Sequence, residues 1–422
     1  MSRSDHPFAF RDFRLFWVAR LSATLAQNCL VVVIGWQVYE LARRTMGMKA
    51  AALQLGFVGL AQFVPLFALT LVTGWAADRV DRRKIACASI ALQAVCGALL
   101  CAITATGHPM IKALIAVACL LGVARAFSMP ALNALAPNLV PIEVLPRAIA
   151  SSAIGNRIGG IGGPALGGYL YAAGAPLPYA ASLALFLLAL LCTLLIRPLA
   201  RTAAPSTQNP WRQMVEGLHY VWSNRLVLGA ISLDLFAVLL GGATAMLPVY
   251  AHDILKTGPS GLGDLRAAPA VGAMLSAVWF SHRPLKHHVG LKMLIAVIVF
   301  GAATVIFGLS HAMALSLVAL ATLGAADMFS VYVRQSLIQI STPDHMRGRV
   351  GAVSSLFISA SNELGEMESG FAAALIGPVP AVVAGGIGAI VVTLVWAKLF
   401  PALRQAMSFE SVATQPPPPV ED

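Results

Sequence analysis

Long apolar stretches alternate with short polar or Gly/Pro-rich interruptions along nearly the whole chain. About 20 consecutive apolar residues are what an α-helix needs to cross the hydrocarbon part of a bilayer. The pattern therefore predicts twelve membrane-spanning helices. They are expected near residues 15–42, 52–77, 85–106, 112–136, 148–173, 178–197, 228–253, 262–281, 289–310, 312–340, 350–376 and 379–400.

The composition excludes an ordinary soluble domain. Apolar residues make up 58% of the chain and charged residues only 11%, and the mean hydropathy is +0.78. Such values are typical of a chain whose solvent is mostly lipid. We therefore predict an all-α integral membrane protein that passes through the bilayer many times.

The positive charges indicate how the helices are oriented. Most of the 29 Lys and Arg residues lie before the first span, in every second loop and after the last span. Because loops rich in Lys and Arg stay in the cytoplasm, both termini are predicted to be cytoplasmic. The net charge of +11 is spread along these loops, where it meets anionic lipid, so we expect no nucleic-acid partner.

The residue types that metal, redox or catalytic chemistry needs are scattered. The six cysteines all lie in apolar spans without metal-ligand spacing, which favours small buried hydrophobic side chains and predicts neither a metal site nor a cofactor. The sequence has no G-x-x-x-x-G-K-[ST] loop for an ATP-driven engine and no nucleophile with a matching base. We therefore predict that the protein is not an enzyme.

The chain contains an internal repeat. Residues 121–128, LGVARAFS, align without a gap on residues 323–330, LGAADMFS, and the same register continues through Gly168 on Gly370. A repeat of this size predicts two six-helix halves in the same orientation. The expected domains are a six-helix bundle at 1–197, a cytoplasmic linker at 198–227, a second six-helix bundle at 228–404 and a disordered tail at 405–422.

The linker and the tail have different compositions. Apolar residues such as Val215, Leu218 and Trp222 recur at helical spacing in the linker. This spacing indicates an amphipathic helix that lies on the cytoplasmic face of the membrane, or a simple linker helix. The tail ends with Pro416 to Pro419 and has too little apolar surface to fold.

The loop after the second span carries the first resemblance to a known family. It runs Gly74-Trp-Ala-Ala-Asp78-Arg79-Val-Asp81-Arg82-Arg83 and resembles the G-x-x-x-D-R-x-G-R-R loop of the major facilitator superfamily, with Asp81 in place of the usual Gly. The resemblance implies the major facilitator fold and a conformational latch. Its latch residues would be Gly74, Asp78, Arg79, Arg82 and Arg83, with the arginines beside carboxylates or lipid headgroups.

The fifth span carries a second resemblance. Residues 159–168, GGIGGPALGG, fit G-x-x-x-G-P-x-x-G-G, which is similar to the antiporter signature of exporters in that superfamily. The motif residues are Gly159, Gly163, Pro164, Gly167 and Gly168. Glycines at this density let helices approach closely and the proline allows a bend, so the alternative is close packing without a bearing on transport direction.

Three further segments indicate a branch of the superfamily. Residues 11–17, 131–141 and 362–370 are similar to the branch that contains bacterial enterobactin exporters and macrolide efflux proteins. The resemblance implies a secondary exporter that works by rocking its two halves around a central site. Cargo of a siderophore-like or drug-like kind is implied by this resemblance alone.

Acidic residues inside the spans are the candidates for proton coupling. An ionised side chain inside the bilayer costs free energy unless it is paired or faces water. Glu363 and Glu366 share one face of the eleventh span, and carboxylates held together out of water can take up and release protons near neutral pH. We name Glu363, Glu366 and Asp327 as candidates; the alternative for the glutamates is that they brace the bundle against Arg157 or Arg334.

Polar and aromatic residues in mid-span are the candidates for the substrate cavity. Arg125 and Asp327 occupy equivalent places in the two repeats, so they would approach one central cavity with opposite charges. Pairing of Asp327 with Arg334 on the same helix is the alternative, and polar mid-span side chains also join helices. The cavity candidates are Gln27, Asn28, Trp36, Arg125 and Asn362.

The sequence therefore predicts a proton-coupled secondary transporter that exports a small amphipathic organic molecule by alternating access. A lysophospholipid flippase and a membrane sensor that does not transport are the alternatives, because both use this architecture. Expected partners are the small-molecule substrate, protons and membrane lipids. We expect a monomer in a bacterial-type inner membrane.

Overall fold

The computed structural model describes residues 6–409, apart from residues 80, 136–137, 142, 198–209, 284, 286 and 344–345. Within these ranges the chain forms helices and short connections, with no β-strand among them. The predicted all-helical membrane fold is confirmed. Nine helices in the described part are long and apolar enough to cross a membrane, and the other three predicted spans are the helices α5, α10 and α13.

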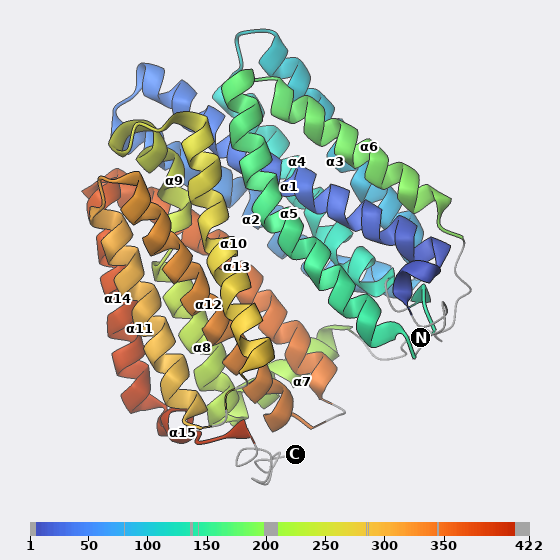
Figure 1. Cartoon of the computed structure of the whole chain (residues 1–422), viewed down its shortest axis with the longest axis vertical. Coiled ribbons are helices and arrows are strands. Elements are labelled where there is room, and N and C mark those ends of the chain that lie inside the picture. The colour runs from blue at the N-terminus through green and yellow to red at the C-terminus, as the bar shows by residue number, and fades with distance from the viewer. Residues whose placement is uncertain are drawn as a thin grey trace. The chain divides into compact units, whose positions relative to one another are not determined.

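The first half has one helix for each predicted span (Figure 1). A short 3₁₀ turn, η2 (Pro7–Ala9), precedes them. The helices are α1 (Arg11–Thr45), α2 (Met48–Arg79), α3 (Arg82–Ala105), α4 (Ile111–Leu135), α5 (Leu145–Ala173) and α6 (Leu177–Leu195).

The second half follows the helix α7 (Pro210–Ser223), and its first span is broken. The broken span comprises α8 (Arg225–Leu240), η4 (Ala243–Met246), α9 (Leu247–Val249) and the π-helical η5 (Tyr250–Ile254). The helices after it are α10 (Gly258–His282), α11 (Val289–Leu309), α12 (Met313–Ser341), α13 (Arg347–Ile376), α14 (Pro378–Leu399) and α15 (Pro401–Gln405). In the register of the sequence repeat, the starts of α4 and α5 match the starts of α12 and α13.

The chain divides into two compact units. The first comprises Met1–Thr45, Leu60–Thr207 and Lys256–Ala267, and the second comprises Met46–Gly59, Gln208–Leu255 and Ala268–Asp422. Each unit thus holds most of one predicted half and a short segment of the other. The helices α2 and α10 each pass from one unit to the other. The predicted domain boundaries remain predictions.

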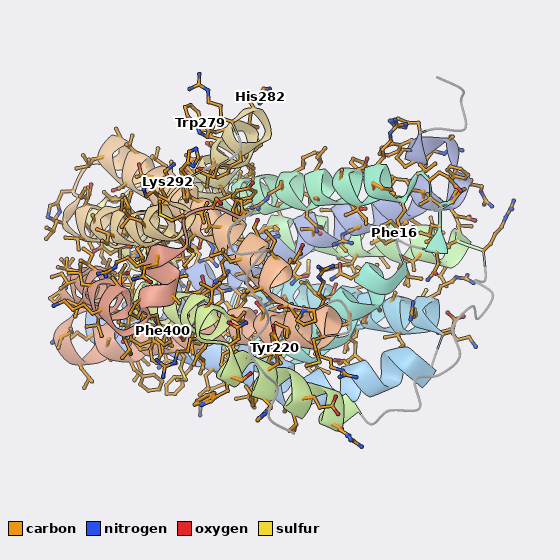
Figure 2. All side chains as sticks on the ribbon, turned by 90° about the horizontal axis from the view of Figure 1, so that it is seen from below. Phe16, Tyr220, Trp279, His282, Lys292 and Phe400 are labelled. Atoms are coloured by element: carbon orange, nitrogen blue, oxygen red, sulfur yellow. The ribbon has the colours of Figure 1, made fainter. Side chains whose placement is uncertain are left out.

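Aromatic side chains fill one end of the first unit. Phe13 and Phe16 of α1 are fully buried beside Ile90 of α3 and Leu135 of α4, and Figure 2 labels Phe16 on α1. Inside a bilayer such aromatic packing stabilises through van der Waals contact between the helices rather than through removal from water. This cluster therefore fixes the ends of α1, α3 and α4 against each other.

The helix α7, which belongs to the second unit, packs against the other helices of that unit with one face only. Tyr220 and Val221 are buried in an apolar cluster with residues of α8, α12 and α13, and the Tyr220 hydroxyl donates to the carbonyl of Ser341 at 2.6 Å. The opposite positions, Val215 and Trp222, are exposed. The helix therefore has one buried and one exposed face, and its place on the cytoplasmic face of the membrane remains a prediction.

The break in the seventh span lies at two glycines. After Leu240 the α-helix stops at Gly241, and the chain continues as the 3₁₀ turn η4. A Cβ on Gly242 would overlap the Ser369 hydroxyl of α13. The close approach of α13 to this point thus requires glycine, and the chain turns there before it resumes a helical path.

The end of the described chain packs on α11. Ala406 is buried, its carbonyl accepts from the Gly290 N–H at 3.1 Å, and the Met407 carbonyl accepts from the His288 N–H at 2.5 Å. Ala406 and Met407 belong to the segment 405–422 that was predicted to be disordered, and here they are packed and hydrogen-bonded. Residues 410–422 lie outside the described part.

Candidate functional site

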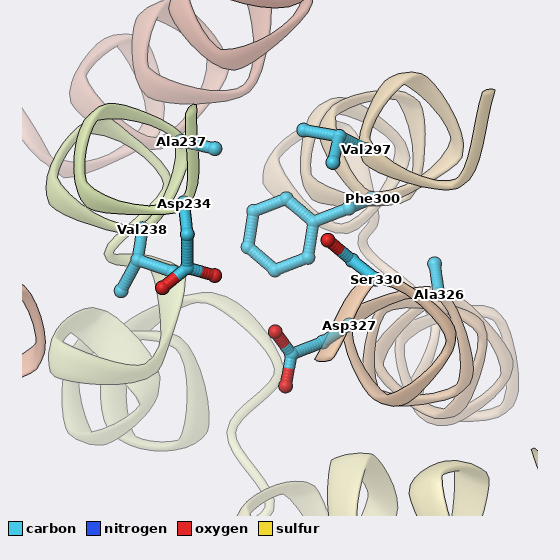
Figure 3. A pocket seen from close by; sticks show the side chains of 8 residues that line it. All are labelled: Asp234, Ala237, Val238, Val297, Phe300, Ala326, Asp327 and Ser330. Carbon is cyan, nitrogen blue, oxygen red and sulfur yellow. The ribbon is translucent and has the colours of Figure 1, made fainter. Parts of the chain in front are cut away.

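A small pocket in the second unit brings two intramembrane carboxylates together (Figure 3). It lies among α8, α11 and α12, and its empty volume is about 240 Å³ including space open to solvent. Figure 3 shows the carboxylates of Asp234 and Asp327 facing this space, with the Phe300 ring beside them. The lining residues are Asp234, Ala237, Val238, Val297, Phe300, Ala326, Asp327 and Ser330.

One of these carboxylates belongs to a buried ion pair. Asp234 of α8 contacts the Arg334 guanidinium of α12, and the exposed fractions of the two side chains are 9% and 2%. The attraction between two charges is stronger out of water, although removing both from water is costly. The pair therefore ties α8 to α12 next to the pocket.

The pocket contains one residue from the predicted set of site residues and several residues that were not in that set. Asp327 was a proton-coupling candidate, whereas Asp234, Phe300 and Ser330 were outside the set. The sequence signal for Asp234 is that it is the one acidic residue within the apolar helix α8. For Phe300 no such signal exists, because a phenylalanine in an apolar span is ordinary.

The polar stripe on α13 lies in the same unit. Glu363 is buried, with 8% of its surface exposed, and Glu366 is half-buried. The Gly59 position of α2 lies against Glu366, so that a Cβ there would be 3.2 Å from the Glu366 Cβ. Asn362 is exposed and its side-chain amide donates to the Ile358 carbonyl at 2.9 Å.

The cavity candidates of the first unit lie on α1 and α4. Gln27 and Asn28 are half-buried, and the Asn28 amide donates to the Thr24 carbonyl at 2.9 Å. Trp36 is buried, and its ring meets Tyr171 of α5 edge to face.

The remaining cavity candidate, Arg125, forms a hydrogen bond with a buried glutamine. Its guanidinium donates to the Gln62 side-chain oxygen at 3.0 Å, and Gln62 is buried in α2. This hydrogen bond joins α4 to α2 within the first unit.

The glycine motif of α5 forms its interface with α1. A Cβ at Gly159 would be 2.6 Å from the Thr24 methyl, and one at Gly163 would be 2.7 Å from the Asn28 Cβ. Gly167 lies against the Cys29 carbonyl, and Gly168 instead faces Pro259 and Gly263 at the start of α10. Pro164 is buried inside α5. The motif therefore lets the backbones of α1 and α5 come close.

The predicted latch lies at the end of α2 and the start of α3. Gly74, Asp78 and Arg79 belong to α2, but their side chains lie outside the described part. Asp81 caps α3, since its carboxylate accepts from the Arg83 N–H at 2.9 Å. Its φ of −55° is open to any residue, which explains why glycine is not required here.

The side chain of Arg83 ends on the backbone of α6. It donates from Nε to the Thr193 carbonyl at 3.2 Å and from its terminal nitrogen to the Leu194 carbonyl. A cation at the last carbonyls of a helix satisfies groups that have no partner within that helix. The sequence placed this arginine beside carboxylates or lipid headgroups, whereas these contacts are with a helix end. Arg82 is half-buried.

A family model and two known proteins each match nearly the whole length of the chain. A family model described as transmembrane secretion effector matches residues 3–422. The enterobactin exporter EntS of Citrobacter koseri is 26% identical over 416 residues, which cover 97% of this chain and 95% of that protein. The enterobactin exporter EntS of Shigella dysenteriae is 25% identical over 384 residues, with 90% and 89% covered.

Solved structures share the fold at low sequence identity. A D-xylose–proton symporter is 15% identical with a TM-score of 0.69, and the match covers 93% of this chain and 98% of that one. A bacterial homologue of the human lysosomal transporter Spinster, inward-facing and unoccupied, is 16% identical with a TM-score of 0.66 and coverage of 95% and 97%. These similarities concern the fold alone.

Proposed function

The chain belongs to the transmembrane secretion effector family of the major facilitator superfamily, in the branch of the enterobactin exporters, and we propose that it is a proton-coupled exporter of a small amphipathic organic molecule. Membership makes the chain a multi-pass membrane transporter rather than an enzyme. The proposal extends to the driving ion, to the cargo and to the mechanism of alternating access.

The pocket with Asp234 and Asp327 is the observation that carries proton coupling. Ionisable groups inside membrane spans are costly and mark ion and proton pathways. A proton that binds Asp327 would remove a negative charge next to Asp234, and so would change the electrostatic balance at its ion pair with Arg334. Since that pair joins α8 to α12, protonation would be linked to helix packing.

The glutamates of α13 are the second place where protons would bind. Glu363 is buried and Glu366 lies against the backbone of α2. A change in charge at Glu366 would act on the contact between α13 and the start of α2, which belong to the same unit. Rocking of the two halves, with the α2–α3 loop as latch, would then move the cargo.

The cargo class rests on the relatives and on the cavity candidates. The curated relatives are named as exporters of enterobactin, and we propose siderophore-like or drug-like cargo of comparable amphipathic character. Gln27, Asn28, Trp36, Arg125 and Asn362 remain the proposed cavity residues. We further propose a monomer in a bacterial inner membrane with both termini in the cytoplasm.

Transport by the purified protein in proteoliposomes tests this function. A pH gradient would be imposed, and its collapse would be followed after addition of a siderophore, a macrolide, a cationic dye or a lysophospholipid. We expect a substrate-dependent proton leak with the siderophore or the macrolide. Movement of the lysophospholipid without protons would instead identify a flippase, and no movement of any compound would favour a sensor.

A further inference from the structure

A cation in the first unit lies between three helices and has neutral partners. Arg20, near the start of α1, donates from Nε to the Asn156 side-chain oxygen of α5 at 3.0 Å. Its terminal nitrogen donates to the Asn133 side-chain oxygen of α4 at 2.8 Å. The guanidinium also lies 5.8 Å from the centroid of the Phe16 ring. Its orientation is therefore fixed from three sides.

None of the three side chains that contact the Arg20 guanidinium carries a negative charge. Among the residues that the structure describes, no carboxylate forms an ion pair with Arg20. A guanidinium has five N–H donors, and the two asparagines accept only two of them. Because a charge within a membrane span is costly unless it is paired or faces water, this site favours a negatively charged ligand.

The surroundings of Arg20 are open and mostly apolar. Asn133 is exposed on α4, and Arg157 is exposed next to Asn156 on α5. Arg20 lies near the start of α1, where a long cationic side chain can reach the water at the membrane surface. Met129 and Ile154 are exposed on the same two helices. The face thus offers the charge of Arg20 together with apolar surface.

We propose that Arg20, Asn133 and Asn156 form a binding site for the oxyanion of an amphipathic organic molecule. This inference rests on the proposed export function and adds a substrate class, organic anions, to it. The two asparagine oxygens hold the planar guanidinium, so its remaining donors can meet two oxygens of a carboxylate side by side. The second unit is less suited to an anion, because its pocket carries Asp234 and Asp327.

Binding of radiolabelled salicylate, an aromatic carboxylate, to the purified full-length protein tests the site. Hydrogen bonds to a charged group are worth about 1.5–3 kcal/mol, so Arg20→Met should weaken salicylate binding about tenfold or more. Binding of tetraphenylphosphonium, an aromatic cation, should not weaken. The matched control is Arg14→Met, since Arg14 is an exposed cation on the same helix, and it should bind salicylate like the wild type.

A second variant separates binding from folding. Asn133→Asp keeps the size of the side chain and its contact with Arg20, but it supplies the missing negative charge. We expect this variant to melt no lower than the wild type and yet to lose salicylate binding. Unchanged salicylate affinity in both Arg20→Met and Asn133→Asp would overturn the proposal.

The oxyanion could belong to a lipid headgroup or to a soluble substrate, and the lipid composition of the nanodisc distinguishes the two. In nanodiscs of phosphatidylcholine alone, salicylate should bind as in detergent. Suppression of this binding by added phosphatidylglycerol would identify an anionic lipid headgroup as the occupant of the same oxyanion site, and no suppression would favour a soluble organic anion. Absence of proton-linked transport together with Arg20-dependent binding would contradict the proposed function and leave the anion site standing.

Discussion

The ion pair of Asp234 and Arg334 shows how single residues shape the pocket. Both side chains are nearly enclosed, so neither charge is well solvated, and each depends on the other for stabilisation. Asp327 faces the same pocket. At the residue scale, one carboxylate thus holds two helices together while its neighbour is proposed to carry the proton.

The first prediction concerns the stability contributed by this pair. Asp234→Asn would leave the buried guanidinium of Arg334 without its negative partner, and such a loss typically costs about 3–5 kcal/mol. We therefore expect a clearly lower melting temperature of the purified protein in a thermal-shift assay. The double variant Asp234→Asn with Arg334→Gln is the control and should recover part of the loss. Equal melting of the single variant and the wild type would contradict the prediction.

The second prediction concerns the cap of α3. Asp81→Ala removes the carboxylate that accepts from the Arg83 N–H, and loss of such a cap costs about 1 kcal/mol. Asp81→Gly should cost only a few tenths of a kcal/mol, since glycine is itself tolerated at this position. Melting temperatures should therefore fall in the order wild type, glycine variant, alanine variant. A glycine variant less stable than the alanine variant would contradict the capping role.

At the element scale, glycines determine how closely α1 and α5 pack. Gly159 and Gly163 meet side chains and backbone of α1, and Trp17 donates from its indole to the Ser151 carbonyl at 3.0 Å along the same interface. These contacts account for the glycine motif by packing within one unit. If the glycine motif also influences the direction of transport, it would do so through the close packing of α1 and α5.

The third prediction tests that packing on α5 itself. A Cβ at Gly163 would lie 2.8 Å from the Leu25 carbonyl, whereas one at Gly160 would meet nothing within 4 Å. Overpacking typically costs about 1–3 kcal/mol, so Gly163→Ala should lower the melting temperature. Gly160→Ala is the matched control and should not. Two variants of equal stability would show that α1 does not approach α5 as closely as described.

The sequence predicts the helices better than their irregularities. Spans are set by apolar length, so their boundaries follow from composition, as for α4, α11 and α14. The break after Leu240 was missed, because two glycines in an apolar run are common. The reason for the break is seen only in the fold, where Phe300 lies against Gly241 and Ser369 lies against Gly242. Likewise, the charge at Asp327 was identified, but its neighbour Asp234 depends on how α8 and α12 pack.

At the scale of the whole molecule, the intramembrane charges differ between the two units. Most of the charges in the spans of the first unit are cations, Arg20, Arg125 and Arg157 beside Glu40, whereas those of the second are mostly acids, Asp234, Asp327 and the glutamates of α13 beside Arg334. This distribution fits a division of work in which one unit binds an anionic group and the other binds protons. Sequence alone lists these charges, and only the fold shows which helices carry the partners of Arg20 and Asp234.

The fourth prediction concerns the orientation of the chain. Because the Lys- and Arg-rich loops are expected to face the cytoplasm, a green fluorescent protein fused after residue 422 should fluoresce in bacteria. Alkaline phosphatase fused at the same place should be inactive. Fusion of the phosphatase after Lys256, in a loop predicted to face outward, is the control and should be active. The reverse pattern would contradict the predicted orientation.

The most direct test of the central claim is transport driven by a pH gradient in proteoliposomes with the wild type and Asp327→Asn. The substrate is the compound that the wild type transports. We predict that the wild type accumulates it against its gradient, and that the variant exchanges it without accumulation, because the proposed proton site is lost while the rest of the protein remains. Glu363→Gln and Glu366→Gln would be measured in parallel. Full accumulation by all three variants would contradict proton coupling through these carboxylates.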